Sequence, residues 1–136
     1  VEVTAYRPRG GEFTDFEGPI WRFVEEHVPK AFEEDRPTVE ACNAWYSGAF
    51  LLETVPSVLY VLMRHADDPE EAIVRAVNDT RDSDTIGAIV GAAIGALHGK
   101  EALPERWRDG LVGRTTADDD GRIYELLGDA RDFFWG

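Results

Sequence analysis

The stretch from Asn78 to Gly99 reads NDTRDSDTIGAIVGAAIGALHG, and it joins two unlike halves. The first half is rich in short oxygen-bearing side chains, namely Asn78, Asp79, Thr80, Asp82, Ser83, Asp84 and Thr85. The second half, from Ile86 to Leu97, contains no charged residue. When a polar turn runs into an apolar helix, its carboxylates lie near the helix N-terminus, where free N–H groups and the helix dipole favour anionic oxygens. We therefore predict an acidic turn, residues 79–85, at the start of an apolar helix.

The apolar half carries a regular glycine pattern. Gly87, Gly91 and Gly95 recur every four residues and share one face of a helix. Each glycine costs a helix roughly 1 kcal/mol relative to alanine, so close approach of another helix must offset the loss. The apolar run is too short to span a membrane, which takes about 20 residues. The pattern predicts a helix that is buried on nearly all sides, with its glycine face against another helix.

Two interpretations of the acidic turn follow from the residues alone. Asp82 and Asp84 with the neighbouring Thr85 suit a hard cation such as Mg²⁺ or Ca²⁺. The simpler alternative is that one of these residues only caps the helix. An EF-hand is excluded because Ile86 and Ala93 would occupy its ligand positions. A Walker loop is excluded because the chain contains no Gly-Lys-Ser/Thr.

The same stretch resembles the C-terminal signature of the ADP-ribosylglycohydrolase family, in which a Gly-Asp-x-Asp-Thr turn opens a Gly/Ala-rich helix. The flanking sequences agree, since Glu53-Thr54-Val55-Pro56 lies upstream and Leu103-Pro104 with Trp107 lies downstream. The resemblance covers residues 46–111. The family's N-terminal Gly-Asp segment and its Thr-Asp-Asp motif are not in this chain. The resemblance thus implies the C-terminal portion of an all-α domain.

The resemblance implies that Asp82, Asp84 and Thr85 are metal ligands. Two Mg²⁺ ions are expected in the complete family domain, with Mn²⁺ as an alternative. The implied reaction is hydrolysis of the glycosidic bond that joins ADP-ribose to a protein side chain. The chain departs from the family where Thr80 and Arg81 replace a frequent Gly-Gly pair. Arg81 is expected to contact the pyrophosphate or to pair with a neighbouring aspartate of the turn.

Further substrate contacts follow from the resemblance. Ser47, Gly48 and Ala49 are expected to line the ribose or adenine pocket, with Arg81 as a fourth substrate-binding residue. The sequence identifies no catalytic residue. Two alternatives remain open, an ADP-ribose-binding module that has lost hydrolysis and a helical interaction domain whose acidic turn is only a cap. The expected partners are an ADP-ribosylated protein or ADP-ribose, and either the missing N-terminal part of the domain or a second copy.

Composition narrows the function classes. The chain has 136 residues, which makes one domain or a fragment of one, and a net charge of −13. That charge argues against nucleic acids and anionic membranes as partners, because both attract basic proteins. A lone Cys42 cannot form an internal disulfide, and the N-terminus lacks the pattern of a signal peptide. We therefore expect a cytoplasmic protein.

Helical periodicity runs through most of the chain. Residues 1–18 are expected to be a loop or a tail. Helices are predicted from Pro19 to just before Pro29, from Val39 to Trp45, across 49–65, up to Asn78, from Pro104 to Leu111, and from about Arg122 to Phe134. We find no strand pattern of useful length. The sequence therefore predicts an all-α fold.

Two positions in these helices invite specific predictions. Asp68, Pro69 and Glu71 have the spacing of a helix N-cap with proline at the first helical position. Glu53 is a lone carboxylate among apolar residues, and a buried carboxylate needs a partner. A hydrogen bond to a neighbouring helix is favoured over a contact with substrate or metal, because most buried polar groups have structural partners.

Overall fold

A computed structural model describes residues 4–111 and 122–136 of the chain. The chain divides into two compact units, Val1–Ala102 and Leu103–Gly136. In the described ranges the regular secondary structure is helical, and the sole β feature is an isolated bridge between Tyr6 and Gly18. The all-α prediction is confirmed. Among the helices of these ranges, none is long and apolar enough to cross a membrane.

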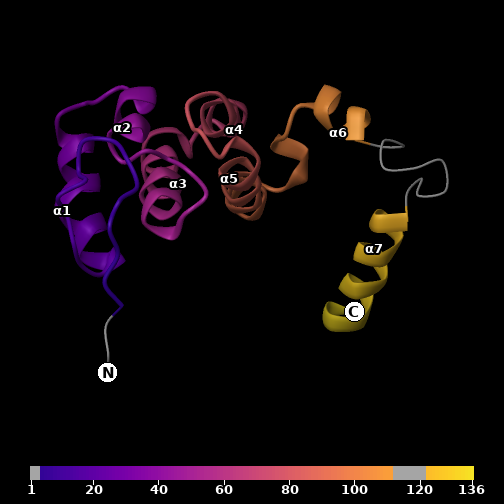
Figure 1. The fold of residues 1–136 in the computed structure, drawn as a ribbon. Helices are drawn as coiled ribbons and strands as arrows, with labels where there is room; N and C mark the ends of the chain where they lie inside the picture. Colours follow the sequence, from indigo (N-terminus) through magenta and orange to yellow (C-terminus); the bar gives the residue numbers. More distant parts are fainter. Residues whose placement is uncertain (1–3, 112–121) are drawn as a thin grey trace. The chain divides into compact units, whose positions relative to one another are not determined.

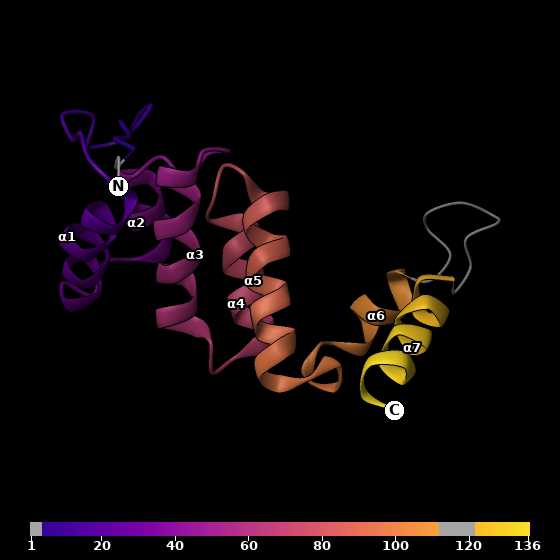
Figure 2. The same ribbon diagram turned by 90° about the horizontal axis from the view of Figure 1, so that it is seen from below.

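The first unit is built around one helix. Its elements are α1 (Ile20–Glu33), α2 (Thr38–Ala44), α3 (Leu51–His65), α4 (Pro69–Asn78), α5 (Ser83–His98) and the 3₁₀ helix η1 (Lys100–Ala102) (Figure 1). Helix α3 packs against α1, α2, α4 and α5. Figure 2 shows α3, α4 and α5 side by side. The second unit contains α6 (Glu105–Leu111) and α7 (Arg122–Trp135).

The core of the first unit lies between α1, α2 and α3. Its buried residues are Phe23, Val28, Ala31, Ala41, Trp45, Leu52 and Tyr60. The rings of Trp45 and Tyr60 meet edge to face with centroids 5.6 Å apart. The indole N–H of Trp45 donates to the Ser57 hydroxyl at 2.8 Å, which satisfies its only polar atom. Residues before α1 extend this core, since Tyr6, Phe13 and Phe16 pack against it.

Helix α1 does not end where the sequence predicts. It continues through Pro29 to Glu33, although proline lacks an N–H and disfavours a helix interior. Tertiary contacts explain the continuation. Val28 and Ala31 are buried on either side of the proline, and the Tyr60 hydroxyl donates to the Ala31 carbonyl at 3.2 Å. Burial of this last turn offsets the cost of the proline.

Helices α4 and α5 form a tightly packed antiparallel pair that presents the acidic turn. The predicted cap of α4 is confirmed, because a side-chain oxygen of Asp68 accepts from the Glu71 N–H at 3.0 Å. Helix α5 starts at Ser83, and Gly99 at its C-cap has a φ of +79°. A left-handed φ is readily accessible to glycine, which explains the stop.

The prediction that α5 is buried on nearly all sides is wrong for this chain. Its buried residues are Ile86, Val90 and Ile94, whereas Ile89 and Leu97 are exposed. Apart from the neighbouring backbone of α5 itself, a Cβ placed at Gly91 or Gly95 would meet no described atom within 4 Å. A Cβ at Gly87 would lie 3.0 Å from Val77 Cγ2 of α4. Helices α3 and α4 therefore cover one face of α5, and most of the glycine face has no neighbour in the described part of the chain.

Candidate functional site

The acidic turn is bonded to a second turn, residues 46–49, which connects α2 to α3. We call residues 46–49 the Ser47 turn. The main-chain N–H of Asp82 donates to the Ser47 carbonyl at 3.0 Å. The main-chain N–H of Arg81 donates to the Ser47 hydroxyl at 3.2 Å. The tertiary structure thus brings together a predicted metal ligand and predicted substrate-binding residues from two distant parts of the sequence.

The Ser47 turn has a strained backbone. Tyr46 and Ser47 have φ values of +75° and +38°, a region that side-chain-bearing residues rarely adopt. Ser47 is fully buried. The Gly48 carbonyl accepts from the Thr54 hydroxyl at 3.1 Å, and the Tyr46 N–H donates to the Asn43 carbonyl at 3.1 Å. Such a conformation persists only where the surroundings hold it from several sides, and these bonds do so.

An ion pair between the buried Glu53 and the half-exposed Arg9 lies directly against the Ser47 turn. Glu53 is fully buried, and its Oε1 accepts from the main-chain N–H of Arg9 at 3.0 Å and from Arg9 Nε at 3.1 Å. Its Oε2 accepts from Arg9 Nη2 at 2.7 Å. The hydrogen bond to Glu53 raises the pKa of Arg9 above its usual value. The prediction of a partner on a neighbouring helix is wrong, because the partner comes from the segment before α1.

Gly48 is required where the turn meets this ion pair. A Cβ at Gly48 would lie 2.7 Å from Glu53 Oε2 and 3.1 Å from Arg9 Nη2. Real side chains do not approach so closely, so the turn can rest on the ion pair only if this position lacks a side chain. Sequence reasoning missed Arg9. The lone carboxylate of Glu53 among apolar residues indicated that a partner was needed, but nothing in the sequence identified Arg9 as that partner.

Asp82 stands at the N-cap position of α5, but its side chain makes no capping hydrogen bond. Its Oδ2 is buried and has no hydrogen-bond partner in the described structure. An ordinary cap would satisfy helix N–H groups with this carboxylate. The capping interpretation therefore does not describe Asp82. A buried polar atom left without a protein partner is uncommon, and the Asp82 oxygen is suited to accept a hydrogen bond or to bind a cation.

Asp84 lies two residues further along the chain, and its side chain is close to that of Asp82. A hydrogen bond with the Asp82 side chain, followed by the main-chain N–H groups of Thr85 and Asp84, holds the pKa of Asp84 below its usual value. Two carboxyl groups in such proximity repel each other when both are ionised, and a proton or a cation between them relieves the repulsion. Thr85 is exposed on the same first turn of α5.

Two further polar residues of the acidic turn, Arg81 and Asp79, contact different neighbours. The guanidinium of Arg81 lies over the Tyr46 ring, 4.6 Å from its centroid. Asp79 faces back toward α4, where its Oδ2 lies 3.5 Å from Arg75 Nη1. Asp79 therefore stabilises the end of α4 and is not directed at the carboxyl pair. Ala49, the last residue of the Ser47 turn, is exposed.

The ligand chemistry at the acidic turn is incomplete within the chain. Across residues 4–111 and 122–136, no group of three or more His, Cys, Asp or Glu side chains gathers closely enough to hold a metal ion. Asp82 and Asp84 supply two carboxylates, and Thr85 adds a hydroxyl. Hard divalent cations take about six or more oxygen ligands, so these residues fit one part of such a set.

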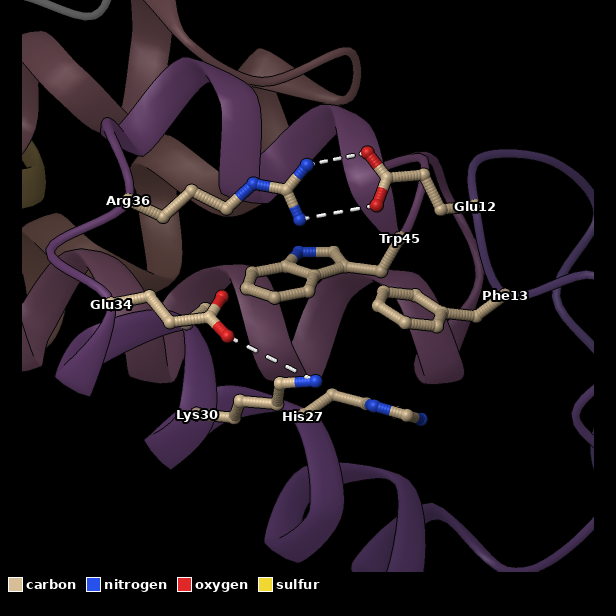
Figure 3. Close-up of a pocket in the computed structure, with 8 residues that line it drawn as sticks. Glu12, Phe13, His27, Lys30, Glu34, Arg36 and Trp45 are labelled. Atoms are coloured by element: carbon tan, nitrogen blue, oxygen red, sulfur yellow. Dashed lines mark hydrogen bonds and ion pairs between the residues drawn. The ribbon is translucent and has the colours of Figure 1, made fainter.

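A cavity of about 230 Å³ lies away from this turn, between the segment before α1, α1 itself and the end of α2. Figure 3 shows the rings of Phe13, His27 and Trp45 within it, with ion pairs on either side. Arg36 pairs there with Glu12, and Lys30 Nζ lies 3.9 Å from Glu34 Oε1. None of the predicted site residues lines this cavity. Because its lining cations are paired with its lining carboxylates, it offers no unmatched charge to a ligand.

Comparisons with known proteins identify the family of the chain. The sequence model of the ADP-ribosylglycohydrolase family matches residues 6–132. An uncharacterized protein of Archaeoglobus fulgidus is 40% identical over 76 residues, which is 55% of this chain and 24% of that protein. ADP-ribosylhydrolase ARH3 of Bos taurus is 28% identical over 102 residues, 67% of this chain and 28% of that enzyme. ADP-ribosylarginine hydrolase Tri1 of Serratia proteamaculans is 30% identical over 66 residues, 48% and 18% of the respective lengths.

The matched segments make up only a small part of these relatives. The aligned regions span about a quarter of the length of the curated relatives. No solved structure matches the chain significantly. The family match nevertheless extends over nearly the whole chain, and it includes both the Ser47 turn and the acidic turn. The chain therefore belongs to the ADP-ribosylglycohydrolase family.

Proposed function

We propose that this chain carries the C-terminal metal-binding part of a hydrolase that releases ADP-ribose from protein side chains by cleaving the glycosidic bond. The observation that carries the proposal is the unpartnered buried Oδ2 of Asp82 beside Asp84 at the start of α5. Family membership supplies the reaction class. The family match spans these residues, and the relatives include proteins named ADP-ribosylhydrolase and ADP-ribosylarginine hydrolase.

The donor set of the acidic turn fits a hard divalent cation. Asp82 and Asp84 offer carboxylate oxygens and Thr85 offers a hydroxyl, which are the ligand types of Mg²⁺ and Mn²⁺. A cation would satisfy the orphaned Asp82 oxygen and relieve the repulsion between the two carboxylates. When bound, Mg²⁺ would supply fixed contacts to ribose hydroxyls and a correctly placed water. The further ligands would come from the part of the family domain that this chain lacks.

We assign the substrate side of the site to Arg81 and the Ser47 turn. Arg81 is exposed, and a planar guanidinium suits the oxygens of a pyrophosphate. Ala49 is exposed at the end of the Ser47 turn and is available for van der Waals contact with a bound ligand. Ser47 and Gly48 are buried, so their role is to hold the turn and the main chain of Asp82 in place.

An alternative function is recognition of ADP-ribose without hydrolysis. The incomplete ligand set of the described residues favours this alternative for the chain by itself. Loss of precise metal placement reduces rate more than binding, since misplacement by about 1 Å can cost ~100-fold in catalysis. The two functions differ in product, because the recognition module would retain intact ADP-ribosylated protein.

The test compares the chain alone with a chimera. The chimera joins this chain to the part of the Archaeoglobus relative that lies outside the aligned segment, over which the two are 40% identical. Each protein is incubated with ADP-ribosylated protein and Mg²⁺, and free ADP-ribose is quantified. We expect negligible release by the chain alone and release by the chimera that is lost in its Asp82→Asn variant. A chimera that binds ADP-ribose but releases none would favour the recognition module.

A further inference from the structure

We propose that Arg9 is a positioning residue for the acidic turn, acting through Glu53 and the Ser47 turn. This inference rests on the proposed function for its consequence, which is cation binding at Asp82 and Asp84. It adds a residue from outside the segment that resembles the family's signature. The argument follows a chain of contacts from Arg9 to the main chain of Asp82.

The first link is the fork between Arg9 and Glu53. Arg9 uses its main-chain N–H, Nε and Nη2 to bind both carboxylate oxygens, at 3.0, 3.1 and 2.7 Å. The guanidinium also lies 5.1 Å from the centroid of the Phe50 ring. A two-pronged contact of this kind fixes direction as well as distance, which a single ammonium cannot do. Arg9 therefore determines where the Glu53 carboxylate lies.

The second link is the contact between this carboxylate and the Ser47 turn. Glu53 Oε2 and Arg9 Nη2 occupy the space next to Gly48, at 2.7 and 3.1 Å from the position of a Cβ there. Tyr46 and Ser47 would not keep their left-handed backbone without support, since such conformations are rare for residues with side chains. The ion pair packs against the turn at Gly48 and so helps to hold this backbone conformation.

The third link joins the turn to the site. The Ser47 hydroxyl accepts a hydrogen bond from the main-chain N–H of Arg81. The Ser47 carbonyl accepts one from the main-chain N–H of Asp82. A shift of Ser47 would therefore move the main chain that carries Arg81 and Asp82. The consequence is that the segment before α1 sets the position of a predicted metal ligand in α5.

Two properties separate positioning from a simple charge effect. Arg9 is a cation near Asp82, and a nearby cation repels a metal ion. If Arg9 acted only through its charge, its removal would tighten cation binding. Positioning predicts the opposite sign. Positioning also predicts that lysine is a poor replacement, because it keeps the charge but loses the fork.

The experiment uses amide hydrogen exchange on the 136-residue chain and Mg²⁺ titration of the chimera described under the proposed function, with Arg9→Lys as the principal variant in both. We expect the Arg81 and Asp82 amides to exchange at least about tenfold faster, while amides of α1 and α4 stay protected. We expect Mg²⁺ affinity to fall by about tenfold, as it does when groups that support metal ligands are changed. Arg7→Lys is the matched control, because Arg7 lies in the same segment and pairs with Glu17 at the surface.

Each outcome decides the proposal. Unchanged exchange of the Arg81 and Asp82 amides in Arg9→Lys, or tighter Mg²⁺ binding in Arg9→Gln, would overturn it. If Arg9→Lys loses protection throughout the chain, the double variant Arg9→Gln/Glu53→Gln replaces it, because this pair leaves no buried charge unmatched. The same selective loss of protection is expected there, and its absence would count against Arg9. Failure of the chimera described under the proposed function to bind Mg²⁺ would contradict that function alone, since the exchange measurement still tests the positioning.

Discussion

The main-chain N–H of Asp82 donates to the carbonyl oxygen of Ser47 at 3.0 Å and thereby joins the start of α5 to the turn before α3. The bond matters because it uses main-chain atoms on both sides. The Asp82 carboxylate takes no part in this bond and does not cap α5, and its Oδ2 has no hydrogen-bond partner in the described residues. The site is therefore held by backbone contacts, while its acidic side chains stay available for a cation.

Removal of either carboxylate should weaken cation binding. We expect Asp82→Ala or Asp84→Ala to lower Mg²⁺ affinity by at least roughly tenfold in the chimera described above, because each change deletes a charged ligand. Isothermal titration calorimetry measures the effect. Asp79→Asn is the control, because Asp79 is directed toward Arg75 and should leave the affinity unchanged. Equal affinity in all three variants and the parent would refute the ligand assignment.

Substitutions on the glycine face of α5, formed by Gly87, Gly91 and Gly95, should change the stability of the chain by different amounts. Gly91→Ala should stabilise the chain by up to about 1 kcal/mol, because alanine favours a helix and nothing described lies within 4 Å of its Cβ. Gly87→Ala should gain less, since its Cβ would press on Val77 Cγ2 at 3.0 Å. Urea denaturation of the two variants gives the comparison. A loss of stability in Gly91→Ala would show that this face is covered.

The same face should behave differently in the complete domain. A mostly apolar helix is normally buried on most sides, whereas a Cβ at Gly91 or Gly95 of α5 would meet no other described element within 4 Å in this chain. In the chimera, Gly91→Leu should lower the thermal midpoint, because overpacking a filled interface costs about 1–3 kcal/mol. Differential scanning calorimetry on both backgrounds separates the cases. A midpoint in the chimera that matches its parent would mean that the added helices do not cover this face.

The Ser47 turn should not tolerate a side chain at Gly48. Gly48→Ala places a Cβ 2.7 Å from Glu53 Oε2, and displacement of the buried Glu53 carboxylate should cost about 1–3 kcal/mol. Thermal unfolding measures the loss. Gly91→Ala serves as the matched glycine substitution without a clash. If Gly48→Ala unfolds at the midpoint of the parent, the close packing of the turn on Glu53 is incorrect.

His27, which lines the cavity beside Phe13 and Trp45, should make stability depend on pH. Burial lowers the pKa of His27, whose ring stacks on Phe13 with centroids 4.1 Å apart. Because the folded pKa lies below the unfolded value, the unfolded chain binds the proton more readily. The contribution of His27 is therefore complete above about pH 6.5 and is lost as the pH falls from there toward the folded pKa.

The variant His27→Phe isolates this contribution. Phenylalanine keeps the ring contacts with Phe13 and Phe23 but cannot titrate. We expect a smaller loss of unfolding free energy in the variant than in the parent between about pH 7.5 and pH 5.5. Chemical denaturation at several pH values gives both curves. Parallel curves would show that His27 has the same pKa in the folded and unfolded chains.

Local features were predictable because their causes lie within a few residues. Asp68 caps α4 through the Glu71 N–H, an interaction that spans three positions and needs no other part of the fold. The start of α5 after the acidic turn follows equally from a polar run that meets an apolar one. Pro29 shows the limit. Its local preference ends a helix, but burial of Ala31 and its contact with Tyr60 carry α1 onward.

By itself, the sequence determined the all-α class, the family resemblance and the acidic residues at the head of α5, because periodicity, caps and motifs act over short distances. Tertiary structure alone decided that Arg9 neutralises Glu53, that Ser47 bonds to Arg81 and Asp82, and that α5 is covered on one face. These contacts join residues far apart in the chain. The packing of the helices decides which arginine reaches the buried Glu53 carboxylate. A local sequence pattern therefore cannot predict that pairing.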